Sequence, residues 1–208
     1  MSIKAIIFDF GGVIIDYKPF TFRKKIAKFL KLHFEIVNKE IDKIEFDLAM
    51  GRINEKEFWK KLCSDLNIAV SENNKKNFIV DEFSRDSRVN KDVDKIIIAL
   101  KNSGYKLGMI SNILEPHAEY SKDKNWFKHF SPVILSCEVG LTKPDERIYK
   151  LMLERLKLEA NECIYIDDRE VNLKPAKKLG MKTILFRNAK QLKKELIDYD
   201  INFFNKNS

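Results

Sequence analysis

Five short apolar runs constrain the fold of this chain more than any other feature. Each is five to eight residues long and consists mainly of β-branched and other apolar residues. They lack the regular alternation of apolar and polar residues that a half-exposed strand shows, so they are typical of parallel strands covered on both faces. The runs occupy residues 4–10, 105–112, 133–138, 163–168 and 182–186.

Helical patterns separate most of these runs. Apolar residues recur at helical spacing in residues 91–102, 145–157 and 172–179. We expect Pro175 in the first turn of the last helix and Gly180 at its end. Strands that alternate with helices predict an α/β fold with a doubly wound, Rossmann-like parallel sheet.

The segment 17–88 interrupts this alternation. It carries almost no strand pattern and predicts amphipathic helices at residues 20–32, 34–50, 55–66 and 71–83. An insertion after the first strand lies over the carboxyl ends of the strands, where open α/β sheets place their sites. The predicted organisation is a core domain of residues 1–16 and 89–208, with residues 17–88 forming a helical cap subdomain.

The composition argues against several other classes of protein. Hydrophobic residues make up 44% of the chain and charged residues 34%, which is typical of a soluble globular protein. The net charge of +8 is interspersed with acidic residues and forms no basic cluster studded with aromatic residues. We therefore expect neither nucleic acid nor a membrane as a partner. No apolar run approaches the roughly 18 residues of a membrane helix, and the N-terminus lacks a secretory pattern, so we expect a cytoplasmic location.

The cysteines fit the same picture. Cys63, Cys137 and Cys163 are widely spaced and lie in no Cys-x-x-Cys pair. We expect them to be small buried apolar side chains in a reducing compartment, not disulfide or zinc ligands.

Polar residues follow the predicted strands at equivalent points. Asp9 and two glycines end the first strand, Ser111 and Asn112 end the second, and Asp167 and Asp168 end the fourth. Lys143 follows the third strand and precedes a helix. Because the strands are parallel, we expect these groups to meet at one edge of the sheet.

The residue types at this edge predict phosphate chemistry with a hard cation. Carboxylates at Asp9, Asp167 and Asp168 provide the oxygen ligands that Mg²⁺ prefers. The Ser111 hydroxyl and the Lys143 ammonium are natural partners for phosphoryl oxygens. Glycines at 11 and 12 allow a tight turn that brings backbone groups close to a ligand.

The order of these motifs resembles that of the haloacid dehalogenase superfamily, most of whose members are phosphatases. The resemblance spans nearly the whole chain and includes a small helical cap like that of sugar-phosphate phosphatases and of the phosphatase domain of soluble epoxide hydrolases. Its motifs are residues 8–13 (FDFGGV), 110–112 (ISN), 140–144 (GLTKP) and 166–168 (IDD), with Asn172 and residues 177–181 (KKLGM).

The resemblance implies a role for each group at the predicted site. Asp9 is expected to be the nucleophile that becomes an aspartyl-phosphate. Ser111, Asn112 and Lys143 are expected to hold the transferring phosphoryl group, with Gly12 and His117 nearby in the phosphate and substrate site. Mg²⁺ is expected to bind Asp9, the backbone carbonyl of Gly11, and Asp167, Asp168 or both.

One position departs from the usual pattern of the family. The phosphatases have a second Asp two residues after the nucleophile, which serves as general acid and base, and this chain has Gly11 there. Such assistance is typically worth about 10²–10⁴-fold, so its loss would slow turnover without excluding it. Asp16 and His117 are candidates to replace it, against the alternatives of a solvated loop aspartate and a surface histidine.

Two other functions stay open. Haloacid dehalogenases also lack the second Asp, but they need no Mg²⁺, so the pair Asp167-Asp168 favours phosphate chemistry. A catalytically weak or idle regulatory binding protein on the same scaffold has only Gly11 in its favour. The leading prediction is an Mg²⁺-dependent phosphatase for a small phosphorylated metabolite, such as a sugar phosphate. Arg52 and Trp59 are candidates to face the substrate from the cap, although Trp59 fits a core position better.

Overall fold

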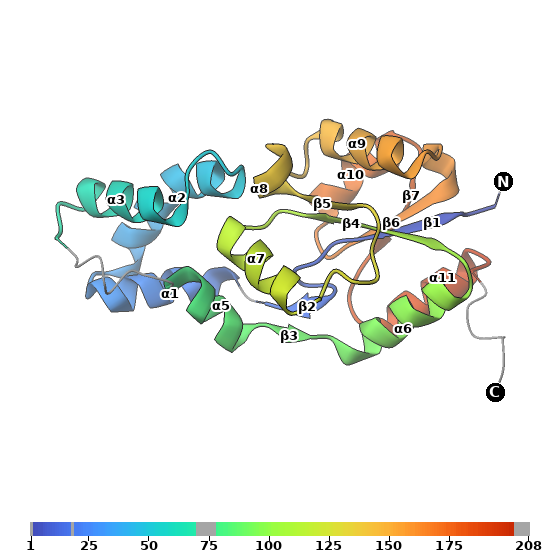
Figure 1. Ribbon diagram of the computed structural model, residues 1–208, viewed down its shortest axis with the longest axis horizontal. Helices are drawn as coiled ribbons and strands as arrows, with labels where there is room; N and C mark the ends of the chain where they lie inside the picture. The colour runs from blue at the N-terminus through green and yellow to red at the C-terminus, as the bar shows by residue number, and fades with distance from the viewer. Residues whose placement is uncertain (1, 18, 70–77, 202–208) are drawn as a thin grey trace.

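A five-stranded parallel sheet forms the centre of the molecule, with strand order β5-β4-β1-β6-β7 (Figure 1). The computed structural model describes residues 2–17, 19–69 and 78–201. The central strand β1 lies between β4 and β6, so that Ile7 is paired with both Gly108 and Tyr165. The strands are β1 (Ala5–Phe8), β4 (Lys106–Ser111), β5 (Val133–Leu135), β6 (Cys163–Asp167) and β7 (Lys182–Leu185).

Helices cover both faces of this sheet. Helices α6 (Lys91–Asn102) and α11 (Ala189–Asp198) lie on one side of it, and α9 (Glu146–Leu156) and α10 (Glu170–Lys178) lie on the other (Figure 1). The short helix α8 (Ser136–Val139) follows β5, α7 (Glu115–Asp123) follows β4, and the 3-10 turn η1 (Ala160–Glu162) precedes β6. The doubly wound α/β fold predicted from the sequence is confirmed.

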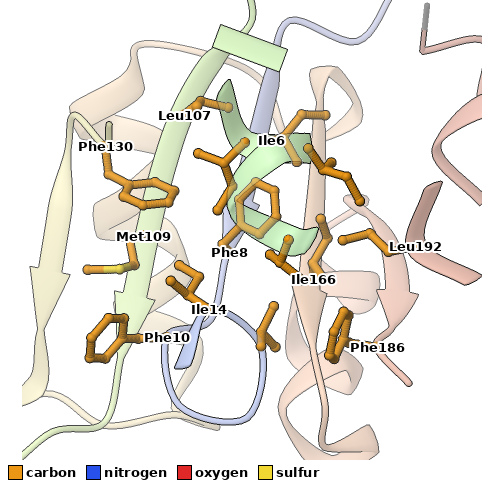
Figure 2. Close-up of a cluster of buried hydrophobic side chains, with 14 of the residues drawn as sticks. Ile6, Phe8, Phe10, Ile14, Leu107, Met109, Phe130, Ile166, Phe186 and Leu192 are labelled. Atoms are coloured by element: carbon orange, nitrogen blue, oxygen red, sulfur yellow. The ribbon is translucent and has the colours of Figure 1, made fainter. Parts of the chain in front are cut away.

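The sheet has a hydrophobic core on each of its two faces, because side chains alternate along the strands. Successive side chains of a strand point to opposite faces, and in β1 Ile6 and Phe8 belong to one core cluster while Ala5 and Ile7 belong to the other. Figure 2 shows Ile6 and Phe8 packed among side chains of β4 and β6, including Met109. Since both faces are buried, β1 contains no polar residue before Asp9.

A separate group of helices lies beyond the carboxyl edge of the sheet (Figure 1). It has its own hydrophobic cluster, which includes Ile41, Phe58 and Trp59. Asn54 begins α3 with a capping box. Its side-chain oxygen accepts from the Glu57 backbone N–H, and the Glu57 carboxylate accepts from the Asn54 backbone N–H. The helices are α1 (Pro19–Leu30), α2 (Phe34–Ala49), α3 (Glu55–Asp65) and α5 (Phe78–Asp86).

The chain passes between the sheet and these helices through a two-stranded antiparallel ribbon. Its strands are β2 (Ile15–Asp16) and β3 (Arg88–Val89), and Ile15 is paired with Val89. The ribbon lies where the sequence predicts the boundaries of the cap subdomain; the boundaries themselves remain a prediction.

Several predicted elements differ from the structure. The run 133–138 is a strand only to Leu135, because Ser136 turns the chain into α8, donating from its hydroxyl to the Ala49 carbonyl (2.6 Å) and accepting from the Ile113 N–H (3.0 Å). Helix α10 begins at Glu170, so Pro175 lies inside the helix and not in its first turn. No bounds were predicted for α7 and α11. The predicted helix 71–83 lies partly outside the described residues, and its described part is α5.

Candidate active site

The groups predicted to meet at one edge of the sheet do meet there. Asp9 follows β1, Ser111 ends β4 and Asp167 ends β6, while Lys143 lies between α8 and α9. The Lys143 Nζ is 2.6 Å from Asp9 Oδ1 and 2.8 Å from Asp167 Oδ2. All four of these side chains are buried. A cation is therefore held between two carboxylates at the carboxyl ends of neighbouring strands.

The Asp167 carboxylate is surrounded by donors. Its Oδ2 accepts from the Tyr165 hydroxyl at 2.5 Å, and its Oδ1 accepts from the Asn172 amide and the Arg169 backbone N–H, both at 2.9 Å. Burial alone would raise the pKa of the Asp167 carboxyl, but Lys143 and these hydrogen bonds outweigh burial and lower it. Tyr165 was missed from the sequence, although its place two residues before Asp167 puts both side chains on one face of β6.

Asp9 is held through one of its two oxygens. Its Oδ1 accepts from the Phe10 N–H at 2.6 Å as well as from Lys143. The described residues engage only this oxygen, so Oδ2 is available for a ligand. Burial raises the pKa of the Asp9 carboxyl, Lys143 opposes that rise, and the Asp167 carboxylate adds to it. Burial lowers the pKa of the Lys143 ammonium, but Asp9 and Asp167 outweigh burial and raise it, so Lys143 stays protonated.

Asp168 lies over the glycine turn that follows Asp9. Gly12 has φ +82°, and a Cβ at this position would lie 2.5 Å from Asp168 Oδ2, so only glycine leaves room for that carboxylate. The Gly12 N–H donates to the Ile15 carbonyl at 2.8 Å. This donor is therefore already used within the turn, and the expected place of Gly12 in the phosphate site remains a prediction.

A set of carboxylates is suited to a hard cation. Oxygen atoms of Asp9, Asp167 and Asp168 lie within 4.8 Å of one another. Asp168 is only half-buried, and burial together with the neighbouring Asp167 raises the pKa of its carboxyl. Of the three, Asp168 has the fewest bonds to other groups in the described part of the chain. The residues present fit Mg²⁺, which commonly binds through one or two carboxylates.

Asn112 contacts the site through Lys143. Its side-chain amide donates to the Lys143 carbonyl at 2.9 Å, and its Oδ1 accepts from the Lys143 N–H at 2.8 Å. The amide therefore fixes the backbone that carries the ammonium. The predicted contact of Asn112 with phosphate thus becomes mainly a positioning role, because both ends of its amide are engaged.

A cavity of about 800 Å³ connects this edge of the sheet to the helices beyond it. Gly11, Ser111, Asn112 and Lys143 line one part of it. The rest is lined mainly by apolar and aromatic side chains, together with the charged residues of α1 and α2: Phe10, Ile15, Tyr17, Phe22, Arg23, Asp42, Glu45 and Phe83. None of these eight residues was predicted from the sequence, because they are scattered over several elements.

Gly11 is open towards the cavity. It lines the cavity, and a Cβ added there would meet no heavy atom within 4 Å. The absence of a second aspartate is therefore not imposed by lack of space.

The two candidates to replace that aspartate occupy different environments. Asp16 is exposed on β2 and does not belong to the cavity lining. His117 lines the cavity and is 4% exposed, so it is not the surface histidine of the alternative interpretation. Its ring stacks on Phe83, with centroids 4.1 Å apart and an interplanar angle of 13°. Burial lowers the pKa of His117 to about 3.

The remaining expectations divide in the same way. Trp59 is 2% exposed and belongs to the hydrophobic cluster of the helical region, as expected of a core residue. Arg52 is exposed, and a guanidinium nitrogen of its side chain is 3.1 Å from Asp47 Oδ1. Neither lines the cavity. Cys63 and Cys163 are buried as expected, but Cys137 is only partly buried. None of the helices in the described ranges has the length and apolar character needed to cross a bilayer.

Comparison with known proteins agrees with this geometry. The chain belongs to the haloacid dehalogenase-like hydrolase family, whose model matches residues 3–180. The family resemblance inferred from the strand-end motifs is thereby confirmed.

Relatives and solved structures extend the comparison. Bifunctional epoxide hydrolase 2 of Sus scrofa is 30% identical over 213 aligned residues, which cover 94% of this chain and 38% of that protein. The chain thus spans less than half the length of this relative. D-ribitol-5-phosphate phosphatase of Bacteroides thetaiotaomicron is 27% identical, with 93% of this chain and 97% of that protein covered. A HAD family enzyme of the same bacterium, crystallised with magnesium and inorganic phosphate, superposes with a TM-score of 0.71 at 25% identity, over 90% of this chain and 96% of that one.

Proposed function

We propose that the protein is an Mg²⁺-assisted phosphatase that hydrolyses a small phosphorylated metabolite through an aspartyl-phosphate on Asp9. One observation carries the proposal: Lys143 is held between Asp9 and Asp167 at the mouth of a cavity of about 800 Å³. A buried ammonium beside a carboxylate with one free oxygen provides both a nucleophile and a positive charge for an anionic substrate. The magnesium and phosphate complex of the structural neighbour supports this function.

We assign the following reaction steps to these side chains. Asp9 Oδ2 bonds to phosphorus while the ester P–O bond breaks, and Lys143 and Ser111 hold the phosphoryl oxygens. The leaving oxygen takes its proton from water, because Gly11 has no side chain that could donate one. A second water then attacks the phosphorus of the aspartyl-phosphate and loses its proton to the hydroxide left by the first step. The acyl-phosphate P–O bond breaks, and inorganic phosphate leaves with Asp9 restored.

We give Asp167 and Asp168 different roles because their hydrogen bonds differ. We assign Asp9, the Gly11 carbonyl and Asp168 as metal ligands, because the oxygens of Asp167 are already engaged by Lys143, Tyr165, Arg169 and Asn172. Asp167 instead positions Lys143. When bound, Mg²⁺ offsets the repulsion between the anionic nucleophile and the anionic phosphoryl group.

Paired substitutions separate these two roles. We expect Asp168→Asn to weaken Mg²⁺ binding by about 10-fold or more, and Asp167→Asn to weaken it less. Isothermal titration with MgCl₂ measures both variants against the wild type. Equal losses in the two variants would show that both carboxylates bind the metal.

We assign the helices α1, α2, α3 and α5 as a cap that closes the cavity over the substrate. Residues of α1, α2 and α5 provide the part of the cavity lining that we expect to face the leaving group, and enclosure by such a cap favours small molecules over phosphoproteins. The relatives named as phosphatases of small metabolites, including the D-ribitol-5-phosphate phosphatase, support this substrate class.

A phosphate-release assay tests the function. Purified protein with a panel of sugar phosphates, other phosphorylated metabolites and p-nitrophenyl phosphate should release phosphate with Mg²⁺ and stop on addition of EDTA. Chloride release from 2-chloropropionate without phosphate release would instead establish a dehalogenase. No turnover in either assay would favour a binding protein.

A further inference from the structure

A wall of aromatic rings forms the part of the cavity contributed by the helices. His117 of α7 stacks on Phe83 of α5, and its ring is T-shaped to Tyr17 and to Phe22, with centroid distances of 5.5 and 6.3 Å. All four residues line the same cavity as Lys143 and Gly11. Apolar rings of this kind, at one side of a cavity, suit contact with a ring in the leaving group.

One polar atom in this wall has no hydrogen-bond partner. Nε2 of His117 is buried and unpaired among the described residues. The ring has a backbone hydrogen bond with Ile79 that raises its pKa, as a bond from a ring N–H to a carbonyl oxygen does. Since Nε2 is the ring nitrogen without a partner, we assign the Ile79 bond to Nδ1 as the donor and the lone pair to Nε2. Burial keeps the imidazole neutral at pH 7.

An unpaired acceptor in an apolar wall is unfavourable unless a ligand pairs with it. A buried polar atom without a partner carries its full desolvation penalty. A donor on the substrate would remove that penalty, whereas a substrate without one would leave it. The charged residues on the same cavity add further acceptors, because two carboxylates, Asp42 and Glu45, share the single guanidinium of Arg23.

We propose that His117 is a specificity-determining residue whose Nε2 accepts a hydrogen bond from a hydroxyl of the leaving group. This inference rests on the proposed phosphatase function and narrows its substrate to the phosphate monoester of a hydroxylated ring. The ring face packs on Phe83 and Tyr17, and the hydroxyl reaches Nε2. The same lone pair means that Nε2 has no proton to give, so His117 selects the substrate and does not replace the missing acid.

A matched series of substrates tests the inference. Cyclohexyl phosphate is compared with esters that carry one hydroxyl or one methoxyl at ring positions 3 or 4, so that the reacting end is unchanged. The variants are His117→Phe, which keeps a ring but removes the acceptor, and His117→Gln, which offers an acceptor at a similar reach. His129→Phe is the control, because His129 also has buried, unpaired ring nitrogens but does not line the cavity.

The wild type should prefer at least one hydroxylated ester over its methoxylated partner by about 10-fold or more in kcat/KM, since the methoxyl cannot donate. His117→Phe should abolish that preference mainly through KM, His117→Gln should retain part of it, and His129→Phe should leave it unchanged. If His117→Phe slows all esters equally, or the wild type shows no preference, the inference is wrong.

A binding measurement separates this inference from the phosphatase function. The Asp9→Asn variant is labelled with ¹⁵N-histidine, and its spectrum is compared with that of the Asp9→Asn/His117→Phe protein. The Nε2 resonance that disappears in the double variant is assigned to His117. It should be that of an unprotonated nitrogen at pH 7 and should shift on adding the preferred hydroxylated ester but not its methoxylated partner. No phosphate release from any ester would refute the phosphatase, and an unmoved resonance would refute the role of His117 independently.

Discussion

The two ends of the cavity differ in how their polar groups are paired. At the sheet end, Lys143 is surrounded by Asp9 and Asp167, and Asp167 has further donors in Tyr165 and Asn172. At the helical end, His117 lies among aromatic rings with Nε2 unpaired in the described part of the chain. At the sheet end Lys143 and Asp167 are paired within the protein, whereas the helical end has a buried acceptor without a partner among the described residues.

We infer from this difference that the sheet end carries out phosphoryl transfer and the helical end selects the substrate. Charges that are fixed by the protein before the substrate arrives need no rearrangement when a phosphoryl group is transferred. An unpaired acceptor does nothing for the transfer itself, but it distinguishes leaving groups that donate from those that do not. Changes at the sheet end should therefore alter turnover of all esters, and changes at the helical end should alter their order.

The largest effect is expected for Asp9→Asn. The substitution keeps the size of the side chain but removes the anionic nucleophile, so kcat should fall by at least about 10³-fold for all phosphate esters alike. Steady-state phosphate release measures this loss, and circular dichroism checks the fold. Retained turnover, or a loss confined to one leaving group, would break the division between the two ends.

The next effect is on stability. Lys143→Met leaves Asp9 and Asp167 facing each other without a cation, and breaking a buried ion pair costs about 3–5 kcal/mol of unfolding free energy. His117→Phe should change the unfolding free energy by less than about 1.5 kcal/mol, because the substitution loses one backbone hydrogen bond but also removes an unpaired buried nitrogen. Urea unfolding in EDTA compares the two variants. Similar losses would show that the ends do not differ in pairing.

The sheet end could be predicted from the sequence, whereas of the helical end only His117 was. Asp9, Ser111 and Asp167 each end an apolar run, and parallel strands bring such points together whatever the details of the helices. The wall of Tyr17, Phe22, Phe83 and His117 follows no such rule, because it depends on how helices from distant parts of the chain pack. The turn in which the Gly12 N–H donates to the Ile15 carbonyl was also not predicted, since it has no distinct sequence pattern.

Helix limits show the same division. Helix α6 was predicted at its observed bounds because its apolar face is regular; the structure adds that Asn90 caps it. Helix α7 was missed because its buried residues include His117 and Ser121, which a search for apolar periodicity does not count.

A smaller effect is expected from Gly11→Asp, which adds an acid between the two ends. The position is open to the cavity, and a carboxyl group there should raise kcat for an alkyl phosphate by about 10²-fold. The gain should be smaller for p-nitrophenyl phosphate, whose leaving group needs little protonation. Gly11→Asn is the matched control, and an equal gain in both variants would show that proton transfer is not the cause.

Trapping the intermediate tests the central claim most directly. Wild-type protein mixed with Mg²⁺ and its best ester, then quenched in acid within milliseconds, should carry one phosphoryl group, and peptide mass spectrometry should place it on Asp9. The Asp9→Asn protein should carry none. A phosphoryl group on another residue, or phosphate release without any phosphorylated protein under single-turnover conditions, would contradict the account.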